Sequence, residues 1–246
     1  MNRPKSPTVT DGPQRAPQRA FFKAMGLTDE DIYKPWVGIA STWNEATPCN
    51  TTLDRQAIAA AAGVSAAGGT PRRFTTIAVS DGIGMGHEGM KASLVSREII
   101  ADSVELMMHA HGYDALVGLA GCDKSLPGMM MAMARLNLPS VFLYGGTILS
   151  GKFQGRDVTI IDVYEGVGAF ASGKMTAEEL YELECNACPS AGSCGGQFTA
   201  NTMACVAEAL GLALPGSGSP PAIDVDPRDA FAKQCGEAVM KLVEKD

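Results

Sequence analysis

The chain has 246 residues, of which 46% are hydrophobic and 19% are charged, and its formal net charge is −7 at pH 7. This length and apolar content are enough to bury one core with a small appendage. The negative charge argues against a nucleic-acid partner, because no basic stripe is available to neutralise phosphates. No apolar run reaches membrane-spanning length, and the amino-terminal residues lack the apolar stretch of a secretory signal. We therefore expect no membrane partner.

The number and spacing of the cysteines indicate the redox state of the cellular compartment. The chain contains seven cysteines and thirteen methionines, and the cysteines do not form the paired framework of a disulfide-rich secreted protein. This usage is typical of a reducing compartment. We expect a cytoplasmic protein, or a mitochondrial or plastid protein if the source is eukaryotic.

Residues 1–19 are dominated by Pro, Gln and Arg and predict a mobile arm, followed by one α/β domain over residues 20–246. Apolar runs in that domain predict strands at residues 37–41, 74–79, 115–120 and 140–144. Helices are predicted at residues 53–67, 93–111, 127–136, 176–185, 199–212 and from 226 onward. These short units with nearly continuous apolar strands indicate a parallel sheet with helices on both faces. The last helix reaches Asp246 without a terminal signature, so we expect the front portion of a longer protein.

Three cysteines stand beside glycine or proline at the ends of apolar runs. They are Cys49 in Thr-Pro-Cys-Asn, Cys122 in Ala-Gly-Cys-Asp-Lys-Ser, and Cys194 in Gly-Ser-Cys-Gly-Gly. Segments this far apart meet only through the fold. Three thiolates at one point suggest an iron–sulfur cluster with one iron left open for chemistry.

Acidic residues lie at two of the predicted strand ends, where parallel sheets bind ligands. Asp123 directly follows Cys122, so a soft thiolate and a hard carboxylate can hold an iron and a Mg²⁺ close together. The alternative is a strand end with a buried thiol and a surface Asp-Lys pair. Asp81 becomes a second hard ligand if its strand neighbours that of Cys122, as sequential strands commonly do; otherwise it is an ordinary turn residue.

The remaining motifs favour structural interpretations. Cys185 and Cys188 have the spacing of half a zinc site, but no second pair or zinc-finger histidines accompany them, which favours ordinary thiols. Cys205 and Cys235 lie in apolar helical patterns and are predicted to be core residues. The glycines of residues 82–86 do not follow the dinucleotide-binding pattern.

Five blocks of sequence are long and unusual, and their order is that of a known family. They are Ser41-Thr-Trp-Asn-Glu45 with Thr47-Pro-Cys-Asn50, Ser80-Asp-Gly-Ile83 with Met85-Gly-His-Glu-Gly-Met90, Ser96-Arg-Glu98 with Ala101-Asp-Ser-Val-Glu105, Gly121-Cys-Asp-Lys-Ser-Leu-Pro-Gly128, and Gly192-Ser-Cys-Gly-Gly196 with Thr199-Ala-Asn-Thr-Met203. These blocks resemble the dihydroxy-acid dehydratase family, which also contains sugar-acid and phosphogluconate dehydratases. The resemblance covers roughly residues 15–216.

The resemblance implies a specific set of ligands. Cys49, Cys122 and Cys194 match the family's cluster ligands, and the presence of Cys49 resembles the branch with a [2Fe–2S] cluster. Asp81 and Asp123 match its Mg²⁺ ligands, and Lys124 matches a lysine that binds the same ion as a carbamate. The carbamate is chemically reasonable, because an ammonium cannot ligate Mg²⁺ whereas an anionic oxygen can.

The implied reaction is the dehydration of 2,3-dihydroxy carboxylic acids to 2-oxo acids in valine and isoleucine biosynthesis, by a homodimeric enzyme acting on a small-molecule substrate. Family members are longer and carry a carboxyl-terminal β-barrel domain that supplies another Mg²⁺ ligand and a serine base. We therefore expect no catalytic base in this chain and no activity from it alone. The alternatives are a sugar-acid dehydratase of the same family and a non-catalytic iron–sulfur or zinc-binding module.

Overall fold

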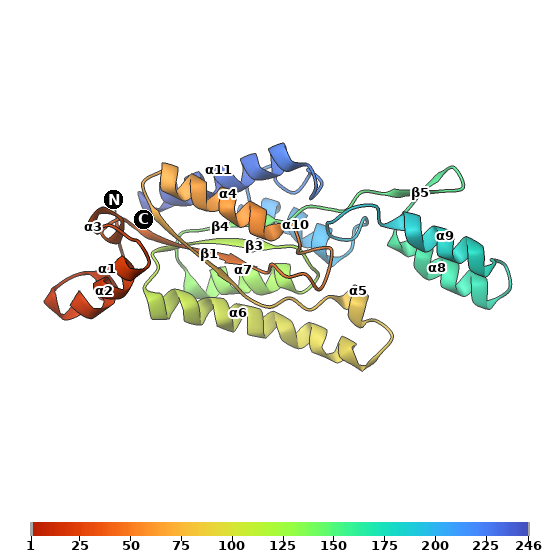
Figure 1. Ribbon diagram of the computed structural model, residues 1–246, viewed down its shortest axis with the longest axis horizontal. Coiled ribbons are helices and arrows are strands. Elements are labelled where there is room, and N and C mark those ends of the chain that lie inside the picture. Colours follow the sequence, from red (N-terminus) through yellow and green to blue (C-terminus); the bar gives the residue numbers. More distant parts are fainter. Residues whose placement is uncertain (1, 246) are drawn as a thin grey trace.

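A computed structural model describes residues 2–245 of the protein. Its centre is a four-stranded parallel sheet in the order β2-β1-β3-β4, as the sequence predicts for the fold class. Helices cover both faces, with α4 and α11 on one and α6, α7 and α10 on the other (Figure 1). The bounds are β1 Trp36–Ser41, β2 Thr70–Thr75, β3 Ala115–Ala120, β4 Ser140–Tyr144, α4 Leu53–Ala66, α6 Lys91–His111, α7 Ser125–Leu136, α10 Thr199–Ala209 and α11 Val225–Val243.

Strand residues alternate between two hydrophobic cores, because successive side chains of a strand point to opposite faces. Trp36, Leu116 and Phe142 belong to the core under α6, α7 and α10. Ile39 and Val117, which are paired in register, belong to the core under α4 and α11. Every residue of β1 and β3 is buried, which explains why these strands read as uninterrupted apolar runs.

The strand predicted at residues 74–79 is wrong in position. The structure places β2 at Thr70–Thr75, where it pairs with β1 from Thr70 opposite Trp36 to Thr75 opposite Ser41. Polar residues and Pro71 are acceptable there because β2 is an edge strand. The expectation that this strand lies next to β3 in the sheet is also wrong, because β1 lies between them.

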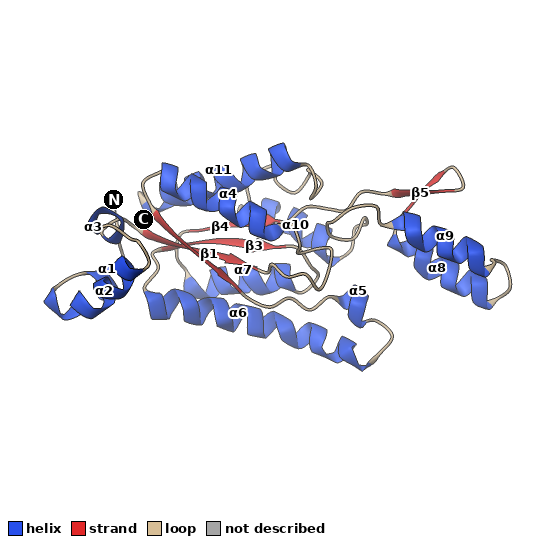
Figure 2. Cartoon of the chain, in the orientation of Figure 1, coloured by secondary structure: helices blue, strands red, loops and turns tan. Residues whose placement is uncertain are grey.

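A long excursion leaves the sheet after β4 and returns to the same place. It contains the hairpin of β5 Gly151–Phe153 and β6 Arg156–Val158, then α8 Ile160–Ala171 and α9 Ala177–Ala187. The two helices project beyond the carboxyl ends of the strands (Figures 1 and 2). The Ile148 amide donates to the Ser193 carbonyl over 2.8 Å and the Ser193 amide to Gly146 over 3.0 Å, which closes the excursion at its base.

The amino-terminal segment, predicted as a mobile arm, forms α1 Pro7–Thr10, a short helical turn and α2 Ala16–Ala24, ahead of α3 Asp29–Ile32. The buried Asp114 carboxylate accepts the amides of Lys5 and Ser6 over 2.7 and 2.8 Å and that of Trp36 over 2.8 Å. These bonds join the segment to the amino edge of the sheet. The mobility of residues 1–19 in solution stays a prediction, against which these contacts argue.

Candidate metal centre

Loops at the carboxyl edge of the sheet carry the three predicted cysteine ligands. Cys49 lies in the loop between β1 and α4, Cys122 follows β3, and Cys194 follows the α8–α9 excursion. Cys49 and Cys122 are 5% and 4% exposed, and Cys194 is half-buried. The parallel topology therefore collects segments that are far apart in sequence at one edge of the sheet.

Hydrogen bonds tie the Cys194 loop to both of the other ligand loops. The Gly192 amide donates to the Pro48 carbonyl over 2.9 Å, and the Ser193 hydroxyl donates to the Gly121 carbonyl. Ser193 is fully buried. The three loops thus form one bonded unit.

Gly121 allows the first two ligand loops to approach each other. A Cβ atom at this position would lie 2.0 Å from the carbonyl oxygen of Cys49, which is far inside van der Waals contact. Only glycine fits while the Cys49 and Cys122 loops stay this close.

The thiols interact with one another. Interaction with Cys122 and then with Cys194, together with burial, raises the pKa of Cys49. The same interaction with Cys49 outweighs burial and lowers the pKa of Cys122, and it lowers the pKa of Cys194 to about 7. The lowered pKa values favour the thiolate form of Cys122 and Cys194 relative to an ordinary cysteine, and the thiolate is the form that binds metal.

Asp81, Asp123 and Lys124 meet beside the thiols. The Lys124 Nζ donates to Asp123 Oδ1 over 2.7 Å and to Asp81 Oδ2 over 2.8 Å. Although burial acts to raise the pKa of Asp81, hydrogen bonds from Lys124 and Ser93 lower it below its ordinary value. Burial likewise opposes the charge of Lys124, but both carboxylates raise its pKa. The ammonium here occupies the place of a cation between two carboxylates.

Asp81 reaches this point by a route that differs from the predicted one. It is the first residue of the short helix α5 Asp81–Gly84, beyond the end of β2. The intervening segment continues along the sheet edge, where the Thr76 amide donates to the Ser41 carbonyl over 2.9 Å. The Ser93 hydroxyl, at the start of α6, donates to the Asp81 carboxylate and fixes its orientation.

The donor set separates into a sulfur part and an oxygen part. The negative charges of Asp123 and Asp81 act to raise the pKa of Cys194, so the two parts are neighbours. Within residues 2–245, no three or more His, Cys, Asp or Glu side chains converge closely enough to hold a single metal ion. By donor chemistry alone, thiols are ligands typical of iron–sulfur clusters and carboxylates are ligands typical of hard divalent cations.

The other cysteines are not among the three interacting thiols, although burial and the nearby Cys194 raise the pKa of Cys188. Cys185 and Cys188 are exposed at the end of α9 and form no disulfide. Cys235 is buried, and burial raises its pKa to about 12. The prediction that Cys205 is a core residue is wrong, because it lies on the exposed face of α10, near the Gln197 amide.

The sequence interpretation missed the residues that support the ligands. Ser93, Tyr144 and Asn201 carry no recognisable local signal, although Asn201 lies in the Thr199–Met203 block. The Tyr144 hydroxyl donates to Asn201 Oδ1 over 2.5 Å, and the Asn201 amide donates to the Cys194 carbonyl over 3.1 Å. Only the packing of β4 against α10 brings them together.

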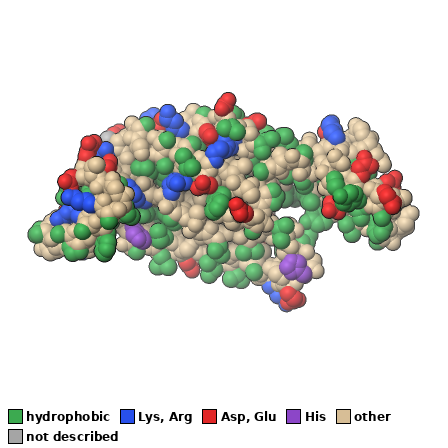
Figure 3. All heavy atoms as spheres, viewed as in Figure 1, with side chains coloured by type: hydrophobic (Ala, Val, Ile, Leu, Met, Phe, Trp, Pro, Cys, Tyr) green, Lys and Arg blue, Asp and Glu red, His purple; other side chains and the backbone are tan. Residues whose placement is uncertain are grey.

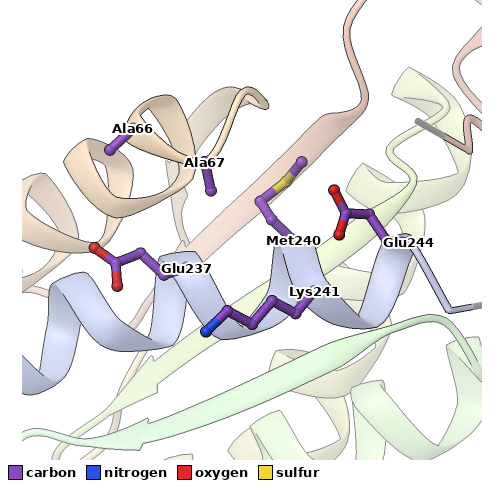
Figure 4. Close-up of a pocket in the computed structure, with 6 residues that line it drawn as sticks. All are labelled: Ala66, Ala67, Glu237, Met240, Lys241 and Glu244. Atoms are coloured by element: carbon purple, nitrogen blue, oxygen red, sulfur yellow. The ribbon is translucent and has the colours of Figure 1, made fainter.

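A surface hollow of about 340 Å³ lies elsewhere, between α4 and α11 (Figure 4). Ala66 and Ala67 on its rim precede the amino end of β2, so the hollow lies at the opposite edge of the sheet from the thiols. It offers Glu237, Lys241 and Glu244 as polar groups and contains no predicted ligand. On the molecular face in Figure 3, acidic and basic side chains are interspersed.

Comparison with known proteins extends over nearly the whole chain. "Dihydroxy-acid dehydratase" of Parvibaculum lavamentivorans is 65% identical over 235 residues, which is 96% of this chain and 41% of that protein. The proteins of the same name from Pelagibacter ubique and Sulfurisphaera tokodaii are 61% and 59% identical, and the alignments cover 43% of each of them. The chain therefore spans about two fifths of the length of these relatives.

Within the part of the chain that the structure describes, no helix combines the length and apolarity needed to cross a bilayer.

Residues 34–246 match the family model described as dihydroxy-acid/6-phosphogluconate dehydratase, N-terminal. This match includes all six predicted ligand positions. The chain belongs to the dihydroxy-acid/6-phosphogluconate dehydratase family.

Proposed function

We propose that the full-length protein is a hydro-lyase that converts 2,3-dihydroxy carboxylic acids to 2-oxo acids in branched-chain amino-acid biosynthesis. The observation that carries the proposal is the junction of Cys122 and Asp123. One backbone step links a buried thiol to a carboxylate that meets Asp81 around a cation. A substrate with oxygens on adjacent carbons can then contact a sulfur-bound and an oxygen-bound metal at once.

The cofactors of the proposed enzyme are a [2Fe–2S] cluster held by Cys49, Cys122 and Cys194, and Mg²⁺ held by Asp81, Asp123 and Lys124 as a carbamate. When bound, both would supply Lewis acidity that favours departure of a hydroxyl group and loss of a proton from carbon. The carboxylates repel each other unless a cation lies between them. Lys124 fills that place as an ammonium, and Mg²⁺ would take it over.

The residues of this chain hold and orient these groups. Ser93 fixes the Asp81 carboxylate, and the bonded loops keep Cys49 and Cys122 away from bulk water. The proton acceptor is proposed to be a serine of the longer protein, outside residues 1–246. We further propose that residues 20–246 act as the metal-cluster domain of a cytoplasmic homodimer.

The test measures turnover of 2,3-dihydroxyisovalerate and of an aldonic acid by the full-length protein after anaerobic reconstitution with iron, sulfide and Mg²⁺. We expect formation of the 2-oxo acid, with higher kcat/KM for the branched-chain substrate. The matched control is Cys122→Ser, which removes one thiolate and leaves the side-chain volume nearly unchanged. Preference for the aldonate would establish a sugar-acid dehydratase instead. A colourless protein that stays colourless after reconstitution and turns over neither acid would indicate a non-catalytic module.

A further inference from the structure

The loop that carries Cys194 is fixed on both sides of the ligand. Before it, Ser193 is bonded through its amide to Gly146 and through its carbonyl to Ile148, which anchors the loop to the extension of β4. After it, the chain turns tightly, and the Gly196 amide donates to the Cys194 carbonyl over 2.9 Å. The support on this carboxyl side of Cys194 comes from α10.

Asn201, in the first turn of α10, supplies that support. Its Nδ2 donates to the Cys194 carbonyl over 3.1 Å and to the Gly196 carbonyl over 2.5 Å. Both hydrogens of the amide are thereby directed at the turn that contains the ligand. The side chain does not serve as the helix cap, because the N-cap residue of α10 is Phe198 and makes no side-chain cap bond.

The Asn201 side chain is itself held in place by Tyr144. Its hydroxyl donates to Asn201 Oδ1 over 2.5 Å, and this bond selects the amide orientation that presents Nδ2 to the two carbonyls. Tyr144 is 1% exposed at the end of β4, and its own carbonyl accepts from the buried Arg228 guanidinium. Burial raises the pKa of the phenol, so it remains a donor at neutral pH. The buried end of β4 thus supports the Asn201 amide.

We propose that Asn201, oriented by Tyr144, is the positioning residue for the cluster ligand Cys194, and that it acts by fixing the backbone on the carboxyl side of this cysteine. The inference rests on the proposed function, because it assumes that Cys194 binds a cluster. Groups that orient a metal ligand typically contribute about ten- to a hundredfold to metal affinity or activity.

The experiment compares the wild-type full-length protein with Asn201→Asp, Tyr144→Phe and Thr202→Ala after anaerobic reconstitution with iron and sulfide. Asn201→Asp keeps the shape but replaces both donors with an acceptor, and Tyr144→Phe removes one hydroxyl. Thr202→Ala is the matched control: it removes a hydroxyl of the same helical turn whose bond, at 3.3 Å, ends on Gln197 and not on the ligand turn. The first measurement is the rate at which an iron chelator bleaches the visible absorption.

We expect Asn201→Asp to bleach about ten- to a hundredfold faster than wild type. Tyr144→Phe loses one hydrogen bond and should bleach about fivefold faster. Thr202→Ala should bleach at the wild-type rate. The visible circular dichroism of the bound cluster should change in the first two variants, because the orientation of one ligand changes. Residues that merely stabilised the fold would lower the unfolding midpoint and leave this spectrum unaltered.

The outcomes separate the two proposals. A wild-type protein that forms no cluster would overturn the proposed function and, with it, this inference. A wild-type cluster with unaltered bleaching and spectrum in Asn201→Asp and Tyr144→Phe would overturn the inference alone. Equal acceleration in Thr202→Ala would also overturn it, since any loosening of α10 would then suffice. If Asn201→Asp does not fold, Tyr144→Phe decides, because it keeps the buried ring.

Discussion

Replacing Gly121 by alanine tests whether the Cys49 and Cys122 loops must touch. The added Cβ would lie 2.0 Å from the Cys49 carbonyl oxygen, whereas ordinary contact begins at 3.4 Å, so the two loops must separate by about 1.4 Å. The obstructing atom belongs to the backbone, which cannot rotate away as a side chain could. Overpacking of this kind typically costs about 1–3 kcal/mol of stability.

The same displacement affects the site. A misplacement of about 1 Å at a reacting centre can lower activity by on the order of a hundredfold. We therefore expect Gly121→Ala to fold with reduced stability, to take up much less cluster after anaerobic reconstitution and to lose most of any dehydratase activity. Visible absorbance per chain and urea unfolding followed by circular dichroism measure the first two effects separately.

Gly195→Ala is the matched control, because it makes the same chemical change directly beside another cluster ligand. Its added Cβ would find its nearest atom, the Ile148 Cγ2, at 3.4 Å, which is ordinary contact. We expect wild-type cluster content and an unfolding free energy within about 0.5 kcal/mol of wild type. If Gly121→Ala took up as much cluster as Gly195→Ala, the close approach of the first two loops would not be a requirement of the site.

Three further substitutions test which residue binds the cluster, which residue binds Mg²⁺, and the stability of α8. Cys122→Ser should abolish the visible absorption of the reconstituted protein, and intact absorption would show that Cys122 is not a ligand. Asp123→Asn should weaken Mg²⁺ binding, measured by calorimetry, by more than about tenfold while the cluster absorption persists. Equal loss of cluster and Mg²⁺ would make Asp123 structural. Gly168→Ala, in α8 with no atom within 4 Å of its added Cβ, should stabilise that helix by about 1 kcal/mol. Slower hydrogen exchange in α8 would support this expectation, and faster exchange would contradict it.

The strands that were predicted correctly are those with both faces buried. Residues 37–41, 115–120 and 140–144 match β1, β3 and β4 to within one residue, because burial on two faces requires a continuous apolar run. The prediction misplaces the edge strand β2 because four of the six residues in its sequence, Thr-Pro-Arg-Arg-Phe-Thr, are polar, whereas the apolar run that suggested a strand continues beyond its end. The β5–β6 hairpin has strands of three residues, too short to show a period of two.

The candidate ligands can be predicted from the sequence because thiols and carboxylates stand at the ends of apolar runs. The hydrogen bonds that support these ligands cannot be predicted in this way. The contact of Ser93 with Asp81 and that of Tyr144 with Asn201 join elements whose relative position depends on helix packing. Sequence spacing alone does not determine such distances.

In the proposed enzyme, the closed excursion of residues 149–192 would delay assembly of the three-cysteine site during synthesis. Cys49 and Cys122 leave the ribosome before this segment, and Cys194 leaves after it, 72 residues later than Cys122. At roughly 5–20 residues per second, Cys122 waits about 4–14 s for the third thiol and Cys49 about 7–29 s. During that interval the nascent chain presents two cysteines without their partner, and they are open to oxidation or to stray metal. In the proposed enzyme, iron and sulfide would therefore complete a three-cysteine site only after Ser193 has paired with Thr147, so cluster insertion would be a late step in folding.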